Sequence, residues 1–149
     1  MKQEQLYDLI WMSRPLMQAA EACVVKGLDG TDLTVRMRAV LEILHRHGDL
    51  SVPEIAAKLE INRQYVQLMV NDTLASGLTR QRPNPRHKRS RLLSLTEDAR
   101  NLIENVMSAE MALMATISAE FSEEEIATAL RVVRAVTDRL KAQQGGDIT

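Results

Sequence analysis

The chain has 149 residues, of which 45% are hydrophobic and 26% charged, and its formal net charge at pH 7 is −1. This length and composition are those of one globular domain, and they exclude a disordered or a membrane-embedded chain. A single cysteine excludes an internal disulfide and a multi-cysteine metal site, and the few aromatic residues argue against a protein that stacks bases on aromatic platforms. The N-terminal residues lack the basic and apolar blocks of a signal peptide, so we expect a cytoplasmic protein.

Helical patterns account for the first part of the chain. Residues 5–25 place apolar side chains at helical spacing, and Pro15 is expected to bend or interrupt that helix. Thr34 is placed to cap a second helix, which Gly48 ends. Residues 51–54, SVPE, have the spacing of a capping box with a proline in the first turn, which predicts a short third helix.

A further helix and a hairpin follow. Asn62 is placed to cap a helix that ends near Gly77. The segments 78–82 and 91–95 flank Pro83-Asn84-Pro85, whose turn chemistry predicts a β-hairpin. Three helices followed by a two-stranded hairpin are the element order of a winged helix-turn-helix domain.

Two long helices are predicted at the end of the chain. Thr96 is placed to cap the first, which carries two apolar stripes and is expected to be packed on two sides. Ser122 and Glu125 have capping-box spacing at the start of the last helix, and residues 143–149 are expected to fray. The two stripes are Leu102, Val106, Leu113 and Ile117, and beside them Ile103, Met107, Met111 and Met114.

Charge is segregated along the chain although its sum is near zero. Residues 79–91 hold six cationic side chains and no acidic one, whereas residues 97–125 hold eight carboxylates against Arg100 alone. Strongly basic stretches usually contact nucleic acid or another anionic surface, and three or four cations would instead be taken for a solvated loop. The concentration of cations in 79–91 therefore favours a nucleic-acid partner.

The helix that Asn62 caps is expected to bury one side and to present polar side chains on the other. Arg, Gln and Asn are side chains that make bidentate contacts with base edges in the major groove. The basic hairpin is expected to contact phosphates or an adjacent minor groove. The pattern predicts DNA binding by a helix with Val66, Met69, Val70 and Thr73 inward, Gln64, Leu68 and Asn71 outward, and Arg63, Tyr65 and Gln67 on its flanks.

The chain resembles the MarR family of bacterial transcriptional regulators, through LTVRMRAVLEIL (33–44), LSVPEIAAKLEINRQYVQLMVNDTLASGLTRQ (50–81) and NPRHKRSRLLSLTEDAR (84–100). The most specific signs are glycine-leucine at 77–78, the basic wing, and leucine-threonine-glutamate at 95–97 before a long helix. The resemblance implies a mainly α-helical fold with a small β-wing. It assigns a dimerisation helix to residues 1–30, the winged helix-turn-helix domain to 31–98, and two dimerisation helices to 99–149.

The resemblance also implies a function and its partners. Members of the family are homodimers that bind palindromic double-stranded DNA, usually as repressors, and are released by small, often phenolic, ligands or by oxidation. No cofactor and no metal are expected. The expected DNA contacts are Ser51, Asn62, Arg63, Gln64, Tyr65, Gln67, Leu68, Asn71, Arg86, His87, Lys88 and Arg89.

The wing departs from the family pattern at one position. The family usually has an aspartate two residues before a key arginine, where it holds the arginine by a charge-assisted hydrogen bond. Here His87 stands two residues before Arg89. We therefore expect a wing tip that is less preorganised or that contacts phosphate itself, with Arg89 as the main wing contact.

Two alternative functions stay open at this point. A winged-helix module that binds protein without sequence-specific DNA binding would lack the steep salt dependence of a DNA binder. In a redox-sensing regulator Cys23 would be the sensor, although a small buried hydrophobe is the commoner role for such a residue.

The sequence offers candidates for a ligand pocket but none for an enzyme site. Met12, Met37, Met107 and Met111 are candidates for lining a pocket, although methionine at helical spacing more often belongs to the core. An enzyme is not expected. His45 and His47 point about 200° apart on a helix and cannot share a metal, and no glycine-rich phosphate loop or nucleophile elbow occurs.

Overall fold

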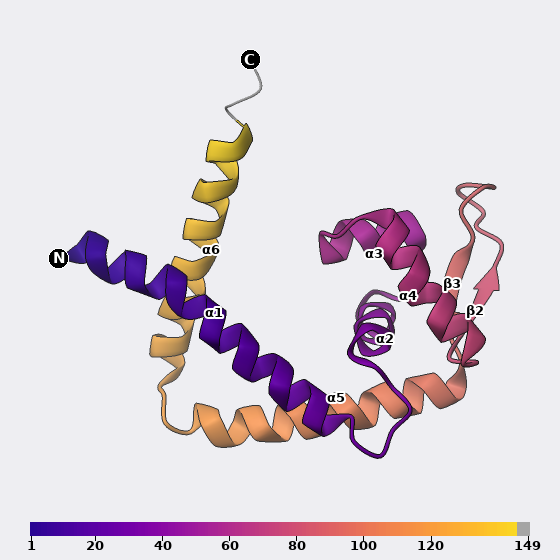
Figure 1. The fold of residues 1–149 in the computed structure, drawn as a ribbon, viewed down its shortest axis with the longest axis horizontal. Coiled ribbons are helices and arrows are strands. Elements are labelled where there is room, and N and C mark those ends of the chain that lie inside the picture. Colours follow the sequence, from indigo (N-terminus) through magenta and orange to yellow (C-terminus); the bar gives the residue numbers. More distant parts are fainter. Residues whose placement is uncertain (146–149) are drawn as a thin grey trace. The chain divides into compact units, whose positions relative to one another are not determined.

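A computed structural model describes residues 1–145 and shows a mainly helical chain with one small antiparallel sheet (Figure 1). The fold class predicted from the sequence is confirmed. Two compact units are present: one consists of Met1–Ala20 and the described residues from Met111 onward, and the other is Glu21–Glu110. We call the second the winged-helix unit and the first the terminal-helix unit. The elements are α1 (Lys2–Gly27), α2 (Val35–His47), β1 (Leu50–Ser51), α3 (Val52–Leu59), α4 (Arg63–Ala75), β2 (Thr79–Arg82), β3 (Leu92–Leu95), α5 (Glu97–Ser118) and α6 (Glu123–Gly145).

Local capping signals set the helix starts, as predicted. The Thr34 hydroxyl accepts the Met37 N–H at 3.1 Å, which begins α2. At the start of α3 the reciprocal capping box between Ser51 and Glu54 is complete, with Ser51 in extended conformation. Asn62 Oδ1 accepts a backbone N–H at 2.7 Å and begins α4. Each of these side chains satisfies a donor that the first helical turn leaves without a partner.

The sheet has three strands in the order β1-β3-β2, so the predicted hairpin gains a strand. β2 pairs with β3, and β1 pairs with the other edge of β3, where Leu50 lies opposite Leu93. A two-residue strand carries no alternation that a sequence pattern could reveal. Its pairing anchors the residues before α3 to the wing.

Two hydrophobic clusters form the core of the winged-helix unit. The first joins α2, α3, α4 and the sheet, with Ile55, Val66 and Leu93 essentially inaccessible to solvent. The second attaches the first half of α5 to α2, through Leu41 and Ile103. Together they fix the helix-turn-helix and the wing in one body.

The terminal helices differ from expectation at three places. α1 continues through Pro15, so an interruption there is wrong, while a bend at Pro15, where the proline removes one backbone hydrogen bond, stays a prediction. α6 extends to Gly145, so fraying from residue 143 is wrong over the described part, and residues 146–149 lie outside it. The two-sided packing of α5 holds only for its first half, since Met111, Leu113 and other apolar residues of its second half are exposed.

Among the described residues, no helix combines the length and apolar character that crossing a bilayer requires.

Candidate nucleic-acid interface

The inner side of α4 is fixed by the core, as the sequence predicted. Val66, Met69, Val70 and Thr73 are all buried. The Thr73 hydroxyl lies 2.8 Å from the Val70 carbonyl, to which it donates. It also lies 2.9 Å from the Thr79 hydroxyl, and this second contact connects the end of α4 to the start of β2. The rotation of α4 about its axis is therefore set by packing, and its opposite side is presented to solvent.

The outer side of α4 is an exposed row of polar side chains. Gln67 donates from Nε2 to Asn71 Oδ1 at 2.9 Å, which links two successive turns of the helix. At the first turn the guanidinium of Arg36, from α2, lies 6.0 Å from the centre of the Tyr65 ring. Leu68, the residue after Gln67, is 58% exposed on the same side of the helix. The exposed residues are Asn62, Arg63, Gln64, Tyr65, Gln67, Leu68 and Asn71.

The turn before α4 is tight. Glu60 has left-handed backbone geometry, with φ of 57°, and the Ile61 N–H donates to the Ala56 carbonyl at 3.2 Å. A non-glycine residue in this region is uncommon and is held here by the packing of α3 against α4. The turn therefore sets the angle between the two helices of the helix-turn-helix.

The wing between β2 and β3 is ordered by hydrogen bonds among its own residues. Asn84 Oδ1 accepts the Arg86 N–H at 3.0 Å, and the His87 N–H donates to the Asn84 carbonyl at 3.3 Å. The Ser90 N–H in turn donates to the His87 carbonyl at 3.3 Å. These turns leave Arg86, His87, Lys88 and Arg89 exposed on the wing.

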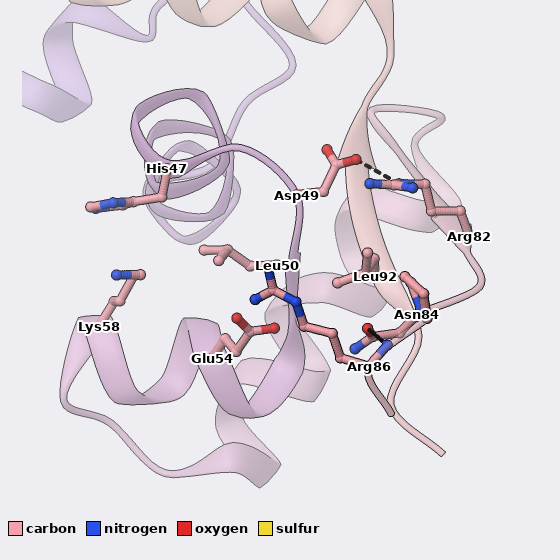
Figure 2. Close-up of a pocket in the computed structure, with 10 residues that line it drawn as sticks. His47, Asp49, Leu50, Glu54, Lys58, Arg82, Asn84, Arg86 and Leu92 are labelled. Atoms are coloured by element: carbon pink, nitrogen blue, oxygen red, sulfur yellow. Dashed lines mark hydrogen bonds and ion pairs between the residues drawn. The ribbon is translucent and has the colours of Figure 1, made fainter. Parts of the chain in front are cut away.

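An aspartate does hold an arginine at the wing, but at its base. Arg82 Nε donates to Asp49 Oδ2 at 2.6 Å, which connects β2 to the residue before β1 (Figure 2). Sequence reasoning missed Asp49 because the two residues are far apart in the chain. The only local signal was an acidic residue between a helix-ending glycine and the capping box.

Ser51 occupies a different environment from the other expected DNA contacts. It is 3% exposed, and its hydroxyl donates to Glu54 Oε1 at 2.9 Å while its N–H donates to the same oxygen at 3.1 Å. Its side chain is thus used within the protein, where it begins α3.

Some of the carboxylates of residues 97–125 are paired with basic side chains inside the winged-helix unit. Arg38 on α2 forms a bidentate pair with Glu110 on α5, with both oxygens of Glu110 within 2.7 Å of Nη2, and also pairs with Glu42 at 2.6 Å. Burial lowers the pKa of Arg38, but the hydrogen bonds to Glu110 and Glu42 outweigh it and raise that pKa above its usual value. His45 lies 3.2 Å from Glu104 on the same pair of helices. Sequence reasoning counted the carboxylates of residues 97–125 but missed both pairs, because their partners lie on another helix.

The residues singled out for ligand binding or redox chemistry lie in both units. Met37 and Met107 are half-buried against the second cluster of the winged-helix unit. Met12 and Met111 belong to the terminal-helix unit and are 61% and 65% exposed. Cys23 is exposed in the single chain, so its expected burial is wrong. A helical pattern places a residue on a face but does not say whether the same chain covers that face.

Comparison with known proteins places this geometry among regulators. The sequence model of the MarR family matches residues 31–90. The transcriptional repressor MdtR of Bacillus subtilis (strain 168) is 28% identical over 130 residues, which are 87% of this chain and 84% of MdtR. The crystal structure of a MarR family transcription regulator is 32% identical with a TM-score of 0.84, and the match covers 98% of this chain and 96% of that one.

A DNA complex is among the similar structures. MepR of S. aureus, solved with DNA, has a TM-score of 0.77 at 20% identity, over 87% of this chain and 96% of that one. At this identity the likeness shows the fold alone.

Proposed function

The chain belongs to the MarR family of transcriptional regulators, and from this premise we propose that it is a homodimeric repressor of palindromic DNA sites that a small molecule releases. We further propose that it acts in the cytoplasm. Its relative MdtR is a repressor, and MepR has been solved with DNA. We propose that this chain shares repression with MdtR and DNA binding with MepR.

One observation supports DNA binding most strongly: the exposed polar side of α4 and the basic wing belong to one compact unit with a shared core. In the proposed complex α4 enters the major groove, where Gln64, Gln67 and Asn71 reach base edges. The wing cations contact phosphates or the neighbouring minor groove, with Arg89 as the main contact. We assign Ser51 and the Asn62 side chain to positioning α3 and α4, because both are engaged as helix caps.

A second copy is the proposed partner of the terminal-helix unit. α1 and α6 contain no buried residue within the described part of the chain. Apolar side chains nevertheless recur along them, and exposed apolar surface of this extent usually marks a protein interface. We propose that the first helix of segment 1–30 and the helices of segment 99–149 form the dimer, with Leu16, Leu113, Ile117, Ile126, Leu130 and Val133 among the contacts.

The effector is proposed to be small and phenolic. Met37 and Met107, half-buried in the winged-helix unit, and Met12 and Met111, exposed in the other, are the proposed ligand contacts. The flexible thioether side chain adapts to ligands of different shape, which supports this choice.

Selection of binding sites by the purified full-length protein from a random DNA library tests this proposal. We expect a palindrome whose half-sites are about one helical turn, roughly 34–36 Å, apart. Asn71→Ala should relax base preference at one position of each half-site, because it removes a base contact. Lys26→Ala, at the exposed end of α1, should select the same sequence as the unchanged protein. Failure to enrich any sequence would contradict the proposed function.

A further inference from the structure

A polar hollow of ≈ 480 Å³ lies beside the wing within the winged-helix unit (Figure 2). Its wall is built from the end of α2 and β1, from α3, and from the wing. Leu50 and Leu92 form an apolar part of the wall, and charged side chains form most of the remainder. This volume is within the range of small-molecule sites.

The two carboxylates of the hollow are already engaged. Asp49 accepts from Arg82 Nε at 2.6 Å. Glu54 Oε1 accepts both the N–H and the hydroxyl of Ser51, at 3.1 and 2.9 Å. Their negative charge is thus partly compensated by groups on the protein.

Two cations of the hollow have no such partner. Among the described residues, Lys58 forms no ion pair or hydrogen bond from its ammonium group, and Arg86 forms none from its guanidinium. Figure 2 shows the guanidinium of Arg86 reaching back from the wing toward α3, the helix that carries Lys58. The cations therefore approach the hollow from two separate elements.

We propose that this hollow binds a phosphate group through Lys58 and Arg86. An arginine fork pairs with phosphate in bidentate fashion, and a lysine adds a compact positive charge. A tetrahedral anion directs oxygens toward both elements at once, whereas a planar carboxylate presents its two oxygens along one edge. The mostly polar wall suits an anion with little apolar surface.

The phosphate group has two possible sources, a free phosphate-bearing molecule and the DNA backbone. Either would bridge α3 and the wing and restrict the wing's movement relative to α3. A free anion would also compete with DNA for Arg86, which is among the proposed DNA contacts. The chemistry at Lys58 is the same in both cases, so one substitution there tests both.

The first arm of the test uses the full-length protein without DNA. Inorganic phosphate is titrated at constant ionic strength, and the backbone amide NMR signals around Leu50, Lys58 and Arg86 are followed. We expect saturable shifts if the occupant is a free anion, and Lys58→Gln should raise the apparent Kd about tenfold, as loss of one charge-assisted contact does. Lys26→Gln, which removes the same charge from the exposed end of α1, should leave the Kd unchanged.

The second arm rests on the proposed function and measures DNA affinity against salt. If the occupant is a backbone phosphate, Lys58→Gln should weaken binding and reduce the salt slope by about one, while Lys26→Gln does neither. The proposal is overturned if phosphate binds equally well to Lys58→Gln. It is equally overturned if phosphate does not bind and Lys58→Gln leaves the slope intact. Because the first arm contains no DNA, a protein that binds phosphate but no DNA would contradict the proposed function alone, and a protein that binds neither would overturn both proposals.

Discussion

The winged-helix unit and the terminal-helix unit differ in how they bury their apolar side chains. The winged-helix unit has a core of its own, in which side chains from helices and strands are inaccessible to solvent. In the terminal-helix unit Leu16 is 64% exposed and Leu130 48% exposed. The difference teaches that one part of the sequence encodes a complete fold, whereas the other encodes a surface that a second chain is proposed to complete.

The largest effect is expected from truncating the core of the winged-helix unit. Leu93, on the central strand, is 1% exposed, and Leu93→Ala should lower the free energy of unfolding by about 2–5 kcal/mol, because it leaves a cavity. Chemical denaturation followed by circular dichroism measures this. Leu92→Ala, at the neighbouring half-exposed position, is the control and should cost less. Equal costs would contradict the assigned core.

A negative charge introduced on the apolar face of α6 should weaken the proposed dimer. Leu130→Asp should shift the protein from dimer to monomer in sedimentation, because a carboxylate would be desolvated at the proposed interface. Thr128→Asp, which adds the same charge to an exposed polar position of α6, is the matched control and should leave the assembly unchanged. A Leu130→Asp protein that stays dimeric would remove α6 from the proposed interface.

The two ion pairs between α2 and α5 should contribute unequally to the free energy of unfolding. Glu110→Gln should lower the free energy of unfolding by about 1–3 kcal/mol, since Arg38 is only 14% exposed and loses a bidentate partner. Glu104→Gln should cost less, because the Glu104 carboxylate is 50% exposed and its partner is a histidine. Thermal unfolding of both variants tests this order, and a larger loss for Glu104→Gln would reverse it.

The smallest effect concerns the start of α6. The Ser122 N–H donates to the Glu125 carboxylate at 3.0 Å, and this bond, with a further one from the Ser122 side chain, lowers the pKa of Glu125 below its usual value. A lowered folded-state pKa means that the carboxylate stabilises the folded form above its unfolded pKa, and that this contribution is lost as pH falls through the folded pKa. The protection of the amides in the first turn of α6, taken relative to their intrinsic exchange rates at each pH, should therefore decrease on acidification, and Glu125→Ala should remove this pH dependence. Unchanged pH dependence in the variant would assign it to another group.

Structural features could be predicted from the sequence when the interacting residues are close together in the chain, and not when they are distant. The caps at Thr34, Ser51 and Asn62 and the inward side of α4 were predictable, because they depend on residues within one or two turns. Strand β1, the Asp49–Arg82 pair and the Arg38–Glu110 pair were not, because their partners are brought together only by the fold. The continuity of α1 at Pro15 also escaped the pattern, since a proline lowers helix stability without always ending the helix.

In the candidate site too, local features were predictable from the sequence and features that depend on the fold were not. The exposed side of α4 and the basic wing could be proposed from periodicity and charge, and the structure places them in one unit. The engagement of the Ser51 hydroxyl by Glu54 and the exposure of Cys23 could not be predicted, because both depend on the folded arrangement of the chain. A residue's face on a helix is a local property, but its burial depends on every element packed against it.

The affinity for a selected palindrome, measured by fluorescence anisotropy over a range of salt concentrations, tests the central claim most directly. If α4 and the wing bind DNA as proposed, log affinity should fall linearly with log salt, by about 0.9 for each phosphate neutralised. Arg89→Ala should weaken binding and reduce that slope by about one. Affinity that is independent of salt, or equal for the palindrome and a scrambled sequence, would contradict the account.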